Sequence, residues 1–256
     1  MTPAQPDFDH ALSQAAALLR KAKYAIAFTG AGISTPSGIP DFRSRHTGLW
    51  EHYDPMEVAS LGVFQSRPEA FFNWLRPLLQ TIWAASPNPA HFALAELETA
   101  GVIKATITQN IDGLHQRAGS RQVYEVHGSL RTMSCPGCGQ TYPSEQFRDT
   151  LEKEGDLPRC PHCRHVIKPD ITLFGEMLPE DIWQEAEDHC ARADLVLVAG
   201  SSLEVWPAAS LPETAVLNGA RLIICNLTPT PLQAQADIFL PLNVADALPR
   251  LATLLH

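Results

Sequence analysis

The chain has 256 residues, 45% of them hydrophobic, and a formal net charge of −9 from 19 basic and 28 acidic residues. This length suits one compact enzyme with a complete core and an inserted module. The acidic balance argues against nucleic-acid binding, which needs basic surface, and is compatible with a cationic peptide partner. No apolar run is long enough to span a membrane and residues 1–10 do not resemble a secretory signal, so we expect a cytoplasmic protein without a membrane partner.

Strand and helix patterns alternate along the chain, which predicts an α/β fold with a Rossmann-like, doubly wound parallel sheet. Apolar residues at helical spacing over 11–22 precede a buried-strand pattern at 24–28. Further strands are expected near 103–108, 122–126, 194–199, 221–225 and 237–240, with a final helix near 245–255.

Two stretches interrupt this alternation: 45–88, which has an aromatic-rich helical pattern, and 131–168, which holds four of the six cysteines. We expect them to form a smaller inserted domain made of a helical module and a zinc ribbon. The Rossmann-like domain would then consist of residues 1–44, 89–130 and 169–256.

The first strand runs directly into a glycine-rich loop. Gly30 and Gly32 would let backbone N–H groups approach a pyrophosphate, because neither residue has a Cβ in the way. The dinucleotide fingerprint is incomplete, however, since Thr35 holds the third small position and Pro36 follows it. The glycines alone therefore leave two interpretations open, a nucleotide site and a tight turn.

A second polar segment, T-Q-N-I-D-G-L-H, follows the strand at 103–108. In open α/β sheets ligands bind at the carboxyl ends of strands, so Gln109, Asn110 and Asp112 are candidates for holding a ligand. The alternative is that Asn110 and Asp112 only cap the next helix.

Two C-x-x-C pairs, Cys135 with Cys138 and Cys160 with Cys163, are separated by 21 residues. This spacing is typical of a structural zinc site, in which two turns aim four thiolates at one tetrahedral ion and leave no open position for catalysis. Histidines 162 and 165 are interpreted as solvated loop residues. Cysteines 190 and 225 lie in helix-like and strand-like segments and are expected to be buried.

Six motifs occur in one order: G-A-G-I-S-x-x-S-G-I-P-D-F-R at 30–43, T-Q-N-I-D-x-L-H at 108–115, V-H-G at 126–128, the paired C-P-x-C, F-G-E at 174–176 and G-S-S-L at 200–203. In this combination the chain resembles the sirtuin family of NAD-dependent protein lysine deacylases, including the bacterial and archaeal protein deacetylases. The resemblance runs from about residue 9 to the last helix. It implies NAD as co-substrate, one structural Zn²⁺, and transfer of an acetyl group from lysine to ADP-ribose with release of nicotinamide.

The resemblance also implies roles for individual residues. His127 would be the catalytic base that acts after nicotinamide has left, and imidazole suits this task because its pKa lies near working pH. Asn110 would order a ribose and water, while Ile111 and Asp112 would hold the nicotinamide carboxamide. His115 is expected to pack structurally, and His91 is the weakest catalytic candidate.

The remaining contacts implied with NAD follow the same motifs. Phe42 would cover the reactive ribose, Gln109 would bond ribose hydroxyls, and the two residues at 243 and 244 would lie beside adenine. The complete predicted set is Gly30, Ala31, Gly32, Thr35, Phe42, Arg43, Gln109, Asn110, Ile111, Asp112, His127, Gly200, Ser201, Ser202, Asn226, Leu227, Asn243 and Val244.

An acyl-lysine peptide would add a strand between two segments of the chain. The predicted contacts are Thr172, Phe174, Gly175 and Glu176 in the first segment, and Leu203, Glu204 and Val205 in the second. The family usually has valine where Thr172 stands, and nothing in the sequence explains the change. Glu204 is expected to favour basic neighbours in the peptide.

The acyl chain is predicted from the aromatic-rich segment. Relatives that remove succinyl or malonyl groups have a tyrosine and an arginine three residues apart there, and the arginine pairs with the substrate carboxylate. This chain has Phe72 and Leu75 at that spacing, with Arg76 one position beyond it. We therefore expect a preference for acetyl and other uncharged acyl groups.

Other functions remain as alternatives at this point. A dehydrogenase would share the nucleotide-binding fold, and an ADP-ribosyltransferase would share the first chemical step. A deacylase that prefers longer or acidic acyl chains is a further possibility, as is a zinc-ribbon binding module without catalysis. The product formed from NAD separates the enzymes, because only a dehydrogenase makes NADH.

Overall fold

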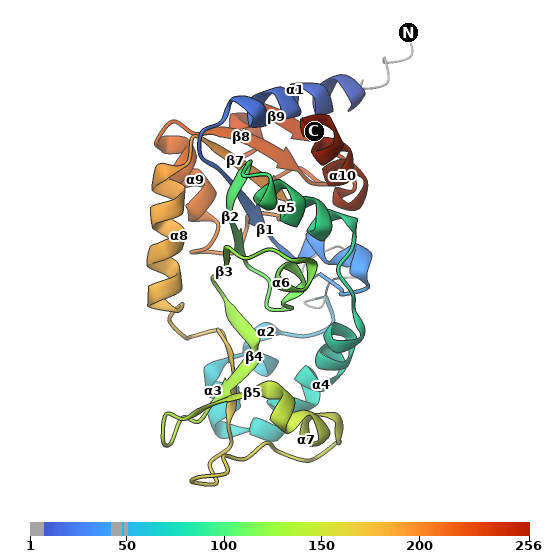
Figure 1. Cartoon of the computed structure of the whole chain (residues 1–256). Coiled ribbons are helices and arrows are strands. Elements are labelled where there is room, and N and C mark those ends of the chain that lie inside the picture. The colour runs from blue at the N-terminus through green and yellow to red at the C-terminus, as the bar shows by residue number, and fades with distance from the viewer. Residues whose placement is uncertain (1–7, 42–47, 49–50) are drawn as a thin grey trace.

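The computed structural model describes residues 8–41, 48 and 51–256 of the chain. Its helices are α1 (Phe8–Lys21), α2 (Pro55–Val58), α3 (Leu61–Ser66), α4 (Pro68–Ala84), α5 (Pro89–Thr99), α6 (Leu114–Ala118), α7 (Arg148–Glu152), α8 (Glu180–Arg192), α9 (Ser210–Leu217) and α10 (Val244–Leu255). Its strands are β1 (Ala25–Thr29), β2 (Ile103–Thr108), β3 (Val123–Glu125), β4 (Gly128–Ser134), β5 (Thr141–Pro143), β6 (Lys168–Ile171), β7 (Leu195–Ala199), β8 (Arg221–Cys225) and β9 (Ile238–Leu240). Figure 1 shows a larger part above and a smaller part below.

Six strands form one parallel sheet in the order β3-β2-β1-β7-β8-β9. Numbered by their sequence order within this sheet, they run 3-2-1-4-5-6, which is the strand order of dinucleotide-binding α/β proteins. The order reverses between β1 and β7, and ligands bind at such a reversal. The Rossmann-like doubly wound sheet predicted from the sequence is thereby confirmed, and its strands lie where they were expected.

Helices cover both faces of this sheet because its strands are apolar on both sides. Ala25 and Ala27 of β1 pack with α1, α5 and α10, whereas Ile26 and Phe28 pack with α8 and α9 on the opposite face (Figure 1). This alternation follows from the two-residue period of a strand. The six-stranded sheet with α1, α5, α6, α8, α9 and α10 is called the body below.

The smaller part, called the small part below, combines the antiparallel sheet β5-β4-β6 with α2, α3, α4 and α7. A third hydrophobic cluster fills it, in which the rings of Phe64, Phe71 and Phe72 meet edge to face. Cys135 and Cys160 are buried in the same cluster. The metal-binding turns are therefore packed directly onto the core of the small part.

Residues 51–88 form three helices rather than one continuous pattern. Proline occupies the first position of α2 and of α4, where its missing N–H costs nothing, and the Ser60 hydroxyl accepts a hydrogen bond from Val63 N (3.3 Å) at the start of α3. The aromatic residues of the sequence pattern lie on α4, the longest of the three.

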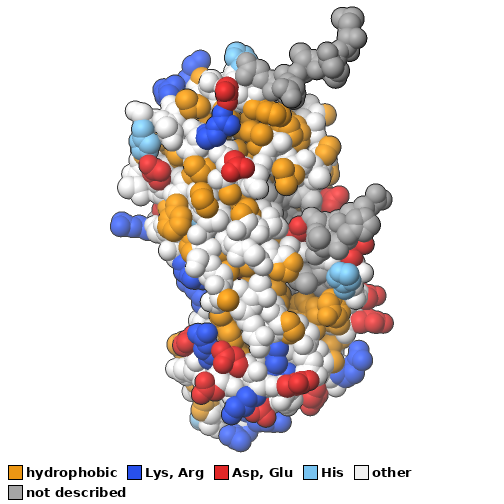
Figure 2. All heavy atoms as spheres, turned by 90° about the vertical axis from the view of Figure 1, so that its right-hand side faces the viewer, with side chains coloured by type: hydrophobic (Ala, Val, Ile, Leu, Met, Phe, Trp, Pro, Cys, Tyr) orange, Lys and Arg blue, Asp and Glu red, His pale blue; other side chains and the backbone are white. Residues whose placement is uncertain are grey.

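The surface carries charged side chains of both signs, as expected from 19 basic and 28 acidic residues in the sequence. On the face drawn in Figure 2, acidic and basic side chains stand side by side at the end formed by the small part. Among the described residues, the helices are all too short or too polar to cross a membrane.

Candidate active site and metal cluster

Three loops meet at the carboxyl ends of β1, β2 and β7, where the strand order reverses. Gly32 N donates to Gly200 O (2.8 Å), Gln109 N donates to Thr29 O (3.0 Å), and the Gln109 amide donates to Ser201 Oγ (2.8 Å). The glycine-rich loop, the Q-N-I-D segment and the G-S-S segment are therefore one cluster, although the sequence separates them widely.

Gly30 and Gly32 are needed for close contact between two loops, and not for the expected approach of their N–H groups to a pyrophosphate. A Cβ on Gly32 would lie 2.8 Å from Gly200 O, and one on Gly30 would lie 3.0 Å from the Ser201 side chain. Because Gly32 N already donates to Gly200, this N–H is occupied within the protein and does not point freely toward a phosphate. The glycines let the loops that follow β1 and β7 approach each other.

No long helix follows β1 in the described residues of this loop. Residues 31–33 and 35–37 instead form two short 3-10 turns.

A buried polar network joins the glycine-rich loop to the Q-N-I-D segment. The Ser34 hydroxyl donates to Asp112 Oδ2 (2.7 Å) and accepts from the Asn110 amide (3.0 Å), and Leu114 N donates to Asp112 Oδ1 (2.9 Å). Burial raises the pKa of Asp112, while the hydrogen bonds from Leu114 and Ser34 partly offset that rise. Asp112 therefore accepts from the first N–H of α6 and also ties this segment to the glycine-rich loop through Ser34.

Ser34 is a functional candidate that the sequence reasoning did not assign. Its side chain is 1% exposed and connects the two motifs through the hydrogen bonds just described. Its membership of the G-A-G-I-S motif could have marked Ser34 as a candidate. No local pattern, however, shows that its hydrogen-bond partner Asp112 lies 78 residues away.

Beneath this network two histidines are buried and neutral. His91 Nδ1 accepts from Asn88 N (3.3 Å) in the N-terminal cap of α5, and His115 Nε2 donates to Thr29 Oγ1 (2.9 Å). Burial lowers the pKa of His91 to about 4, and burial together with the neighbouring His91 lowers that of His115 to about 3. Their rings meet edge to face with centroids 4.9 Å apart. Both histidines act as uncharged structural groups.

His127 lies between β3 and β4 and is half-buried. Its Nδ1 is 3.1 Å from Gln109 O, and because a carbonyl can only accept, Nδ1 must carry the proton of the neutral ring. Nε2 then carries the lone pair. Burial lowers the pKa of His127, which keeps the ring neutral around pH 7. A neutral imidazole with a defined, unprotonated Nε2 is suited to accept a proton.

The first predicted peptide segment is already paired along one edge. Phe174 N donates to Ala59 O (3.0 Å) and Leu61 N donates to Phe174 O (3.0 Å), while Thr172 N donates to His127 O (2.8 Å). Glu176 accepts from Leu173 N and forms an ion pair with Lys168 (2.9 Å). The segment is thus fixed along this edge, at Phe174 to the small part and at Thr172 to the residue that carries the candidate base.

The second predicted peptide segment begins with a buried residue. Leu203 is 3% exposed, packs in the cluster beneath α8 and α9, and has a φ of 57°. Its side chain belongs to the core of the body, and its backbone N–H donates to Ser201 Oγ (3.3 Å). Glu204 is exposed and Val205 is half-buried.

The remaining predicted NAD contacts are spread along the same strand ends. Asn226 follows β8, where its amide donates to Thr228 O (2.8 Å), and Leu227 is 67% exposed. Asn243 caps α10 by accepting from Ala245 N (2.9 Å), and Val244 is buried. Ala31, Thr35, Ile111 and Ser202 are at least partly exposed beside the cluster. Phe42 and Arg43 lie outside the described residues.

The four cysteines of the two C-x-x-C pairs come together in the small part. Their sulfur atoms all lie within 4.8 Å of one another, and Cys135 Sγ is 3.3 Å from Cys163 Sγ. Four thiolates bound to one Zn²⁺ at ~2.3 Å would lie about 3.8 Å apart, so the cluster fits this ion. With four protein ligands the ion would have no open position, and its role would be structural.

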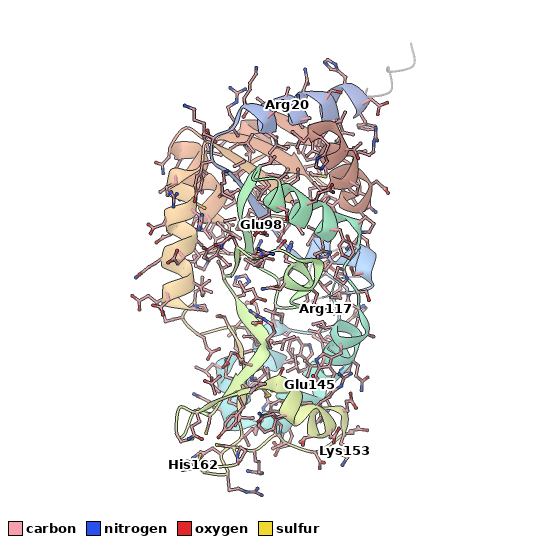
Figure 3. All side chains as sticks on the ribbon, in the orientation of Figure 1. Arg20, Glu98, Arg117, Glu145, Lys153 and His162 are labelled. Atoms are coloured by element: carbon pink, nitrogen blue, oxygen red, sulfur yellow. The ribbon has the colours of Figure 1, made fainter. Side chains whose placement is uncertain are left out.

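The other cysteines and the loop histidines lie away from this cluster. Cys190 and Cys225 are buried in α8 and β8. Histidines 162 and 165 are exposed, and Figure 3 shows His162 at the outer end of the small part. A hollow between α4 and α7 is lined by Gln80, Trp83, Ala84, Arg148 and Glu152, none of which belongs to the predicted site.

Comparison with known proteins identifies relatives over nearly the whole chain. A family model described as the Sir2 family matches residues 30–207. An NAD-dependent protein deacetylase of Sulfurisphaera tokodaii is 50% identical over 232 residues, which is 91% of each chain. An NAD-dependent protein deacylase of Archaeoglobus fulgidus is 46% identical over 241 residues, which is 94% of each chain.

Solved structures show the same fold. A Sir2 enzyme structure superposes with a TM-score of 0.90 at 44% identity, covering 96% of this chain and 98% of the other. A Sir2 variant with a deacetylated peptide and 3'-O-acetyl ADP ribose superposes with a TM-score of 0.89 at 41% identity, covering 94% and 97%. A complex of a Sir2 homologue with NAD superposes with a TM-score of 0.87 at 40% identity, covering 94% of this chain and 92% of the other.

Proposed function

The chain belongs to the Sir2 family, and from this premise we propose that it is an NAD-dependent protein lysine deacetylase. It consumes NAD, water and an acetyl-lysine side chain, and it releases nicotinamide, the free lysine and O-acetyl-ADP-ribose. The names of the curated relatives and the acetyl-ADP-ribose found with a related structure support this reaction.

The observation that carries the proposal is the orientation of His127. Its Nδ1–H donates to Gln109 O, which presents Nε2 as the proton acceptor. In the proposed reaction Nε2 removes a proton from a ribose hydroxyl, so that this oxygen can attack the carbon of the transferred acetyl group. The same ring can return the proton to the lysine nitrogen.

We propose that NAD binds across the strand-order reversal, in contact with the predicted set given above. Gln109 and Asn110 follow β2, Ser201 and Ser202 follow β7, and Asp112 is fixed by Ser34 in a position to hold the nicotinamide amide. Two further arguments support this site: ligands of open α/β sheets bind at such reversals, and a related structure contains NAD.

For the acetyl-lysine protein we propose strand addition between 172–176 and 203–205. The first segment uses one edge to pair with residues 59–61, which leaves its other edge for a peptide. Related Sir2 structures with peptides support this type of partner. A cytoplasmic location stays a prediction from the sequence.

Zinc and the division into domains complete the proposal. We propose that Cys135, Cys138, Cys160 and Cys163 hold one structural Zn²⁺. We also propose residues 45–88 and 131–168 as a small domain inserted into a Rossmann-like domain of 1–44, 89–130 and 169–256. The two separate sheets support this division.

An acetyl preference follows from the surroundings of α4. The Arg76 guanidinium donates to Asn73 Oδ1 (2.7 Å) and to Asp156 O, and the residue is 6% exposed. Phe72 and Leu75 are fully buried in the apolar cluster. Because Arg76 is already bound inside the small part, we propose that it does not serve as a carboxylate clamp. A related structure with a propionylated peptide supports acceptance of other uncharged acyl groups.

One incubation tests the function. The protein is mixed with NAD and an acetyl-lysine peptide, and mass spectrometry follows nicotinamide, the peptide and the acetyl group. We expect deacetylated peptide and O-acetyl-ADP-ribose in equal amounts. ADP-ribose attached to peptide or protein, or NADH detected by absorbance, would replace the proposal with one of the alternative enzymes.

A further inference from the structure

The candidate base lies on a connection between the two parts of the molecule. β3, in the sheet of the body, ends at Glu125, and β4, in the sheet of the small part, begins at Gly128. Only Val126 and His127 stand between them. His127 is therefore not held by a helix or a strand of its own, and its position depends on how this connection is fixed.

Three side chains form a closed ring of hydrogen bonds across the connection. The Ser129 hydroxyl donates to Glu125 Oε1 (3.2 Å), Arg131 Nη2 donates to Glu125 Oε2 (2.5 Å), and Arg131 Nε donates to Ser129 Oγ (3.1 Å). Glu125 belongs to the body, whereas Ser129 and Arg131 belong to the small part. The ring thus spans His127 from one side to the other.

The same residues contact the loop that orients the imidazole. Leu130 N, between the two β4 members of the ring, donates to Ile111 O (3.3 Å) in the Q-N-I-D segment. Glu125 is also in register with Thr108, the residue before Gln109, whose carbonyl accepts from His127. The ring therefore fixes both ends of the His127–Gln109 hydrogen bond.

We propose that Glu125, Ser129 and Arg131 are positioning residues that hold His127 at the reacting ribose, an inference that rests on the proposed deacetylase function. We call the three the β3–β4 clamp. Glu125 is 8% exposed, so its carboxylate is held in place, whereas Arg131 is 61% exposed and reaches over the connection from outside. An exposed arginine adds little stability by charge alone. Its main effect is to restrict the two residues that it bridges.

The test compares two rates in the same preparation. Nicotinamide exchange into NAD needs peptide and the first step, whereas deacetylation also needs the base. Because a displacement of about 1 Å at a catalytic group can cost on the order of a hundredfold, we expect Glu125→Gln and Arg131→Ala to lower the ratio of deacetylation to exchange at least about tenfold. Arg131→Lys, which keeps a cation for Glu125, should recover part of the ratio.

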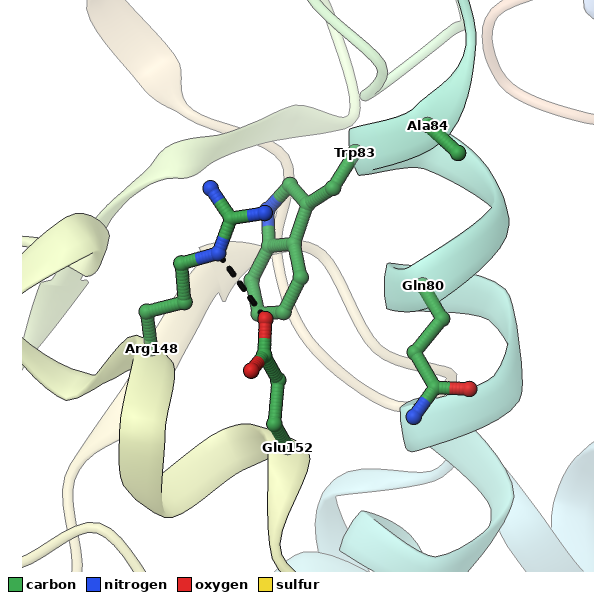
Figure 4. A pocket seen from close by; sticks show the side chains of 5 residues that line it. All are labelled: Gln80, Trp83, Ala84, Arg148 and Glu152. Carbon is green, nitrogen blue, oxygen red and sulfur yellow. Dashed lines mark hydrogen bonds and ion pairs between the residues drawn. The ribbon is translucent and has the colours of Figure 1, made fainter.

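Arg148→Ala is the matched control. Arg148 of α7 forms an exposed ion pair with Glu152 (2.9 Å), drawn with a dashed line in Figure 4, and it takes no part in the proposed site. This variant should keep the ratio of the parent. A merely structural clamp would lower both rates together and lower the melting temperature without changing the ratio.

The outcomes separate the two proposals. Parent-like ratios in both Glu125→Gln and Arg131→Ala would overturn the clamp, while a parent that releases no nicotinamide would overturn the function. Zinc content and circular dichroism verify folding. If Glu125→Gln does not fold, Arg131→Ala decides the test alone, because its side chain is largely exposed.

Discussion

The metal cluster and the candidate active site are assembled from the chain in opposite ways. The four cysteines come from two short turns, and each turn supplies two thiolates from within four consecutive residues. The active site instead joins groups that are distant in sequence, such as Gln109 with Ser201, which are 92 residues apart, and Ser34 with Asp112. Local spacing therefore suffices to recognise the first, whereas the second depends on the strand order of the whole sheet.

The comparison also predicts how each region fails. Loss of one cysteine should remove the ion and unfold the small part, since its core includes the cluster, while the body keeps its own hydrophobic clusters. Loss of one polar group at the sheet edge should leave the fold in place and change the chemistry. The predictions below separate the two kinds of failure.

The largest effect is expected at the metal cluster. Cys135→Ala or Cys160→Ala should lose zinc and most activity, because a structural site contributes its binding free energy to folding. Metal analysis of the purified proteins checks this result. Cys190→Ala removes a buried thiol outside the cluster and should keep one zinc per chain. Unchanged zinc in both cluster variants, or none in the parent, would contradict the assignment.

At the sheet edge, Asp112→Asn removes the charge to which Ser34 and Leu114 donate. Hydrogen bonds to charged groups contribute about 1.5–3 kcal/mol each, so losing one should lower kcat/KM for nicotinamide exchange about 10- to 150-fold. Zinc content should not change. Asp149→Asn, on the exposed surface of α7, serves as control and should match the parent. Exchange at the parent rate in Asp112→Asn would remove Asp112 from the first step.

The acyl chain tests how the small part contributes to the site. With Arg76 bound to Asn73 and Asp156, a succinyl carboxylate would find no free cation on α4, all of whose residues are described. We expect kcat/KM for acetyl-lysine to exceed that for succinyl-lysine at least about tenfold, or roughly 1.4 kcal/mol in transition-state binding. Kinetics on one peptide sequence measure the ratio. The reverse order would point to Arg76 as a carboxylate clamp, and Arg76→Ala would then abolish the succinyl activity.

The smallest effect is the pH dependence of stability that the buried histidines beneath the sheet edge cause. Their folded pKa values of about 4 and about 3 lie below the ordinary 6.5, so below pH 6.5 the unfolded chain binds protons that the folded chain does not. Each histidine should therefore lower the free energy of unfolding by about 1 kcal/mol between pH 7 and pH 5.5. Urea unfolding of His115→Gln and the parent at both pH values checks this. An equal loss in the two proteins would show that His115 does not titrate on unfolding.

Much of the architecture could be predicted because its signals are local. The expected strands of the body match β1, β2, β3, β7, β8 and β9, since each is a short apolar run between polar turns. The two C-x-x-C pairs came together for the same reason. The helices of 51–88 were less predictable, because their boundaries depend on single residues such as Ser60 and Pro68.

What could not be predicted depends on contacts between distant segments. Position 32 needs glycine because a Cβ there would collide with Gly200 O, and no residue near position 32 in the sequence indicates this contact. Ser34 carries no local mark of its bonds to Asn110 and Asp112. Likewise, Leu203 ends in the core because its loop turns through a positive φ, which its residue type does not suggest.

The central claim is that Nε2 of His127 accepts a proton only after nicotinamide has left. The most direct measurement is the pair of rates, deacetylation and nicotinamide exchange, in His127→Ala at saturating NAD. The account predicts that deacetylation falls at least about a hundredfold, the lower range for loss of a general base, while exchange stays measurable. His162→Ala, at the exposed end of the small part, should keep both rates. Deacetylation by His127→Ala at the rate of the parent would contradict the account.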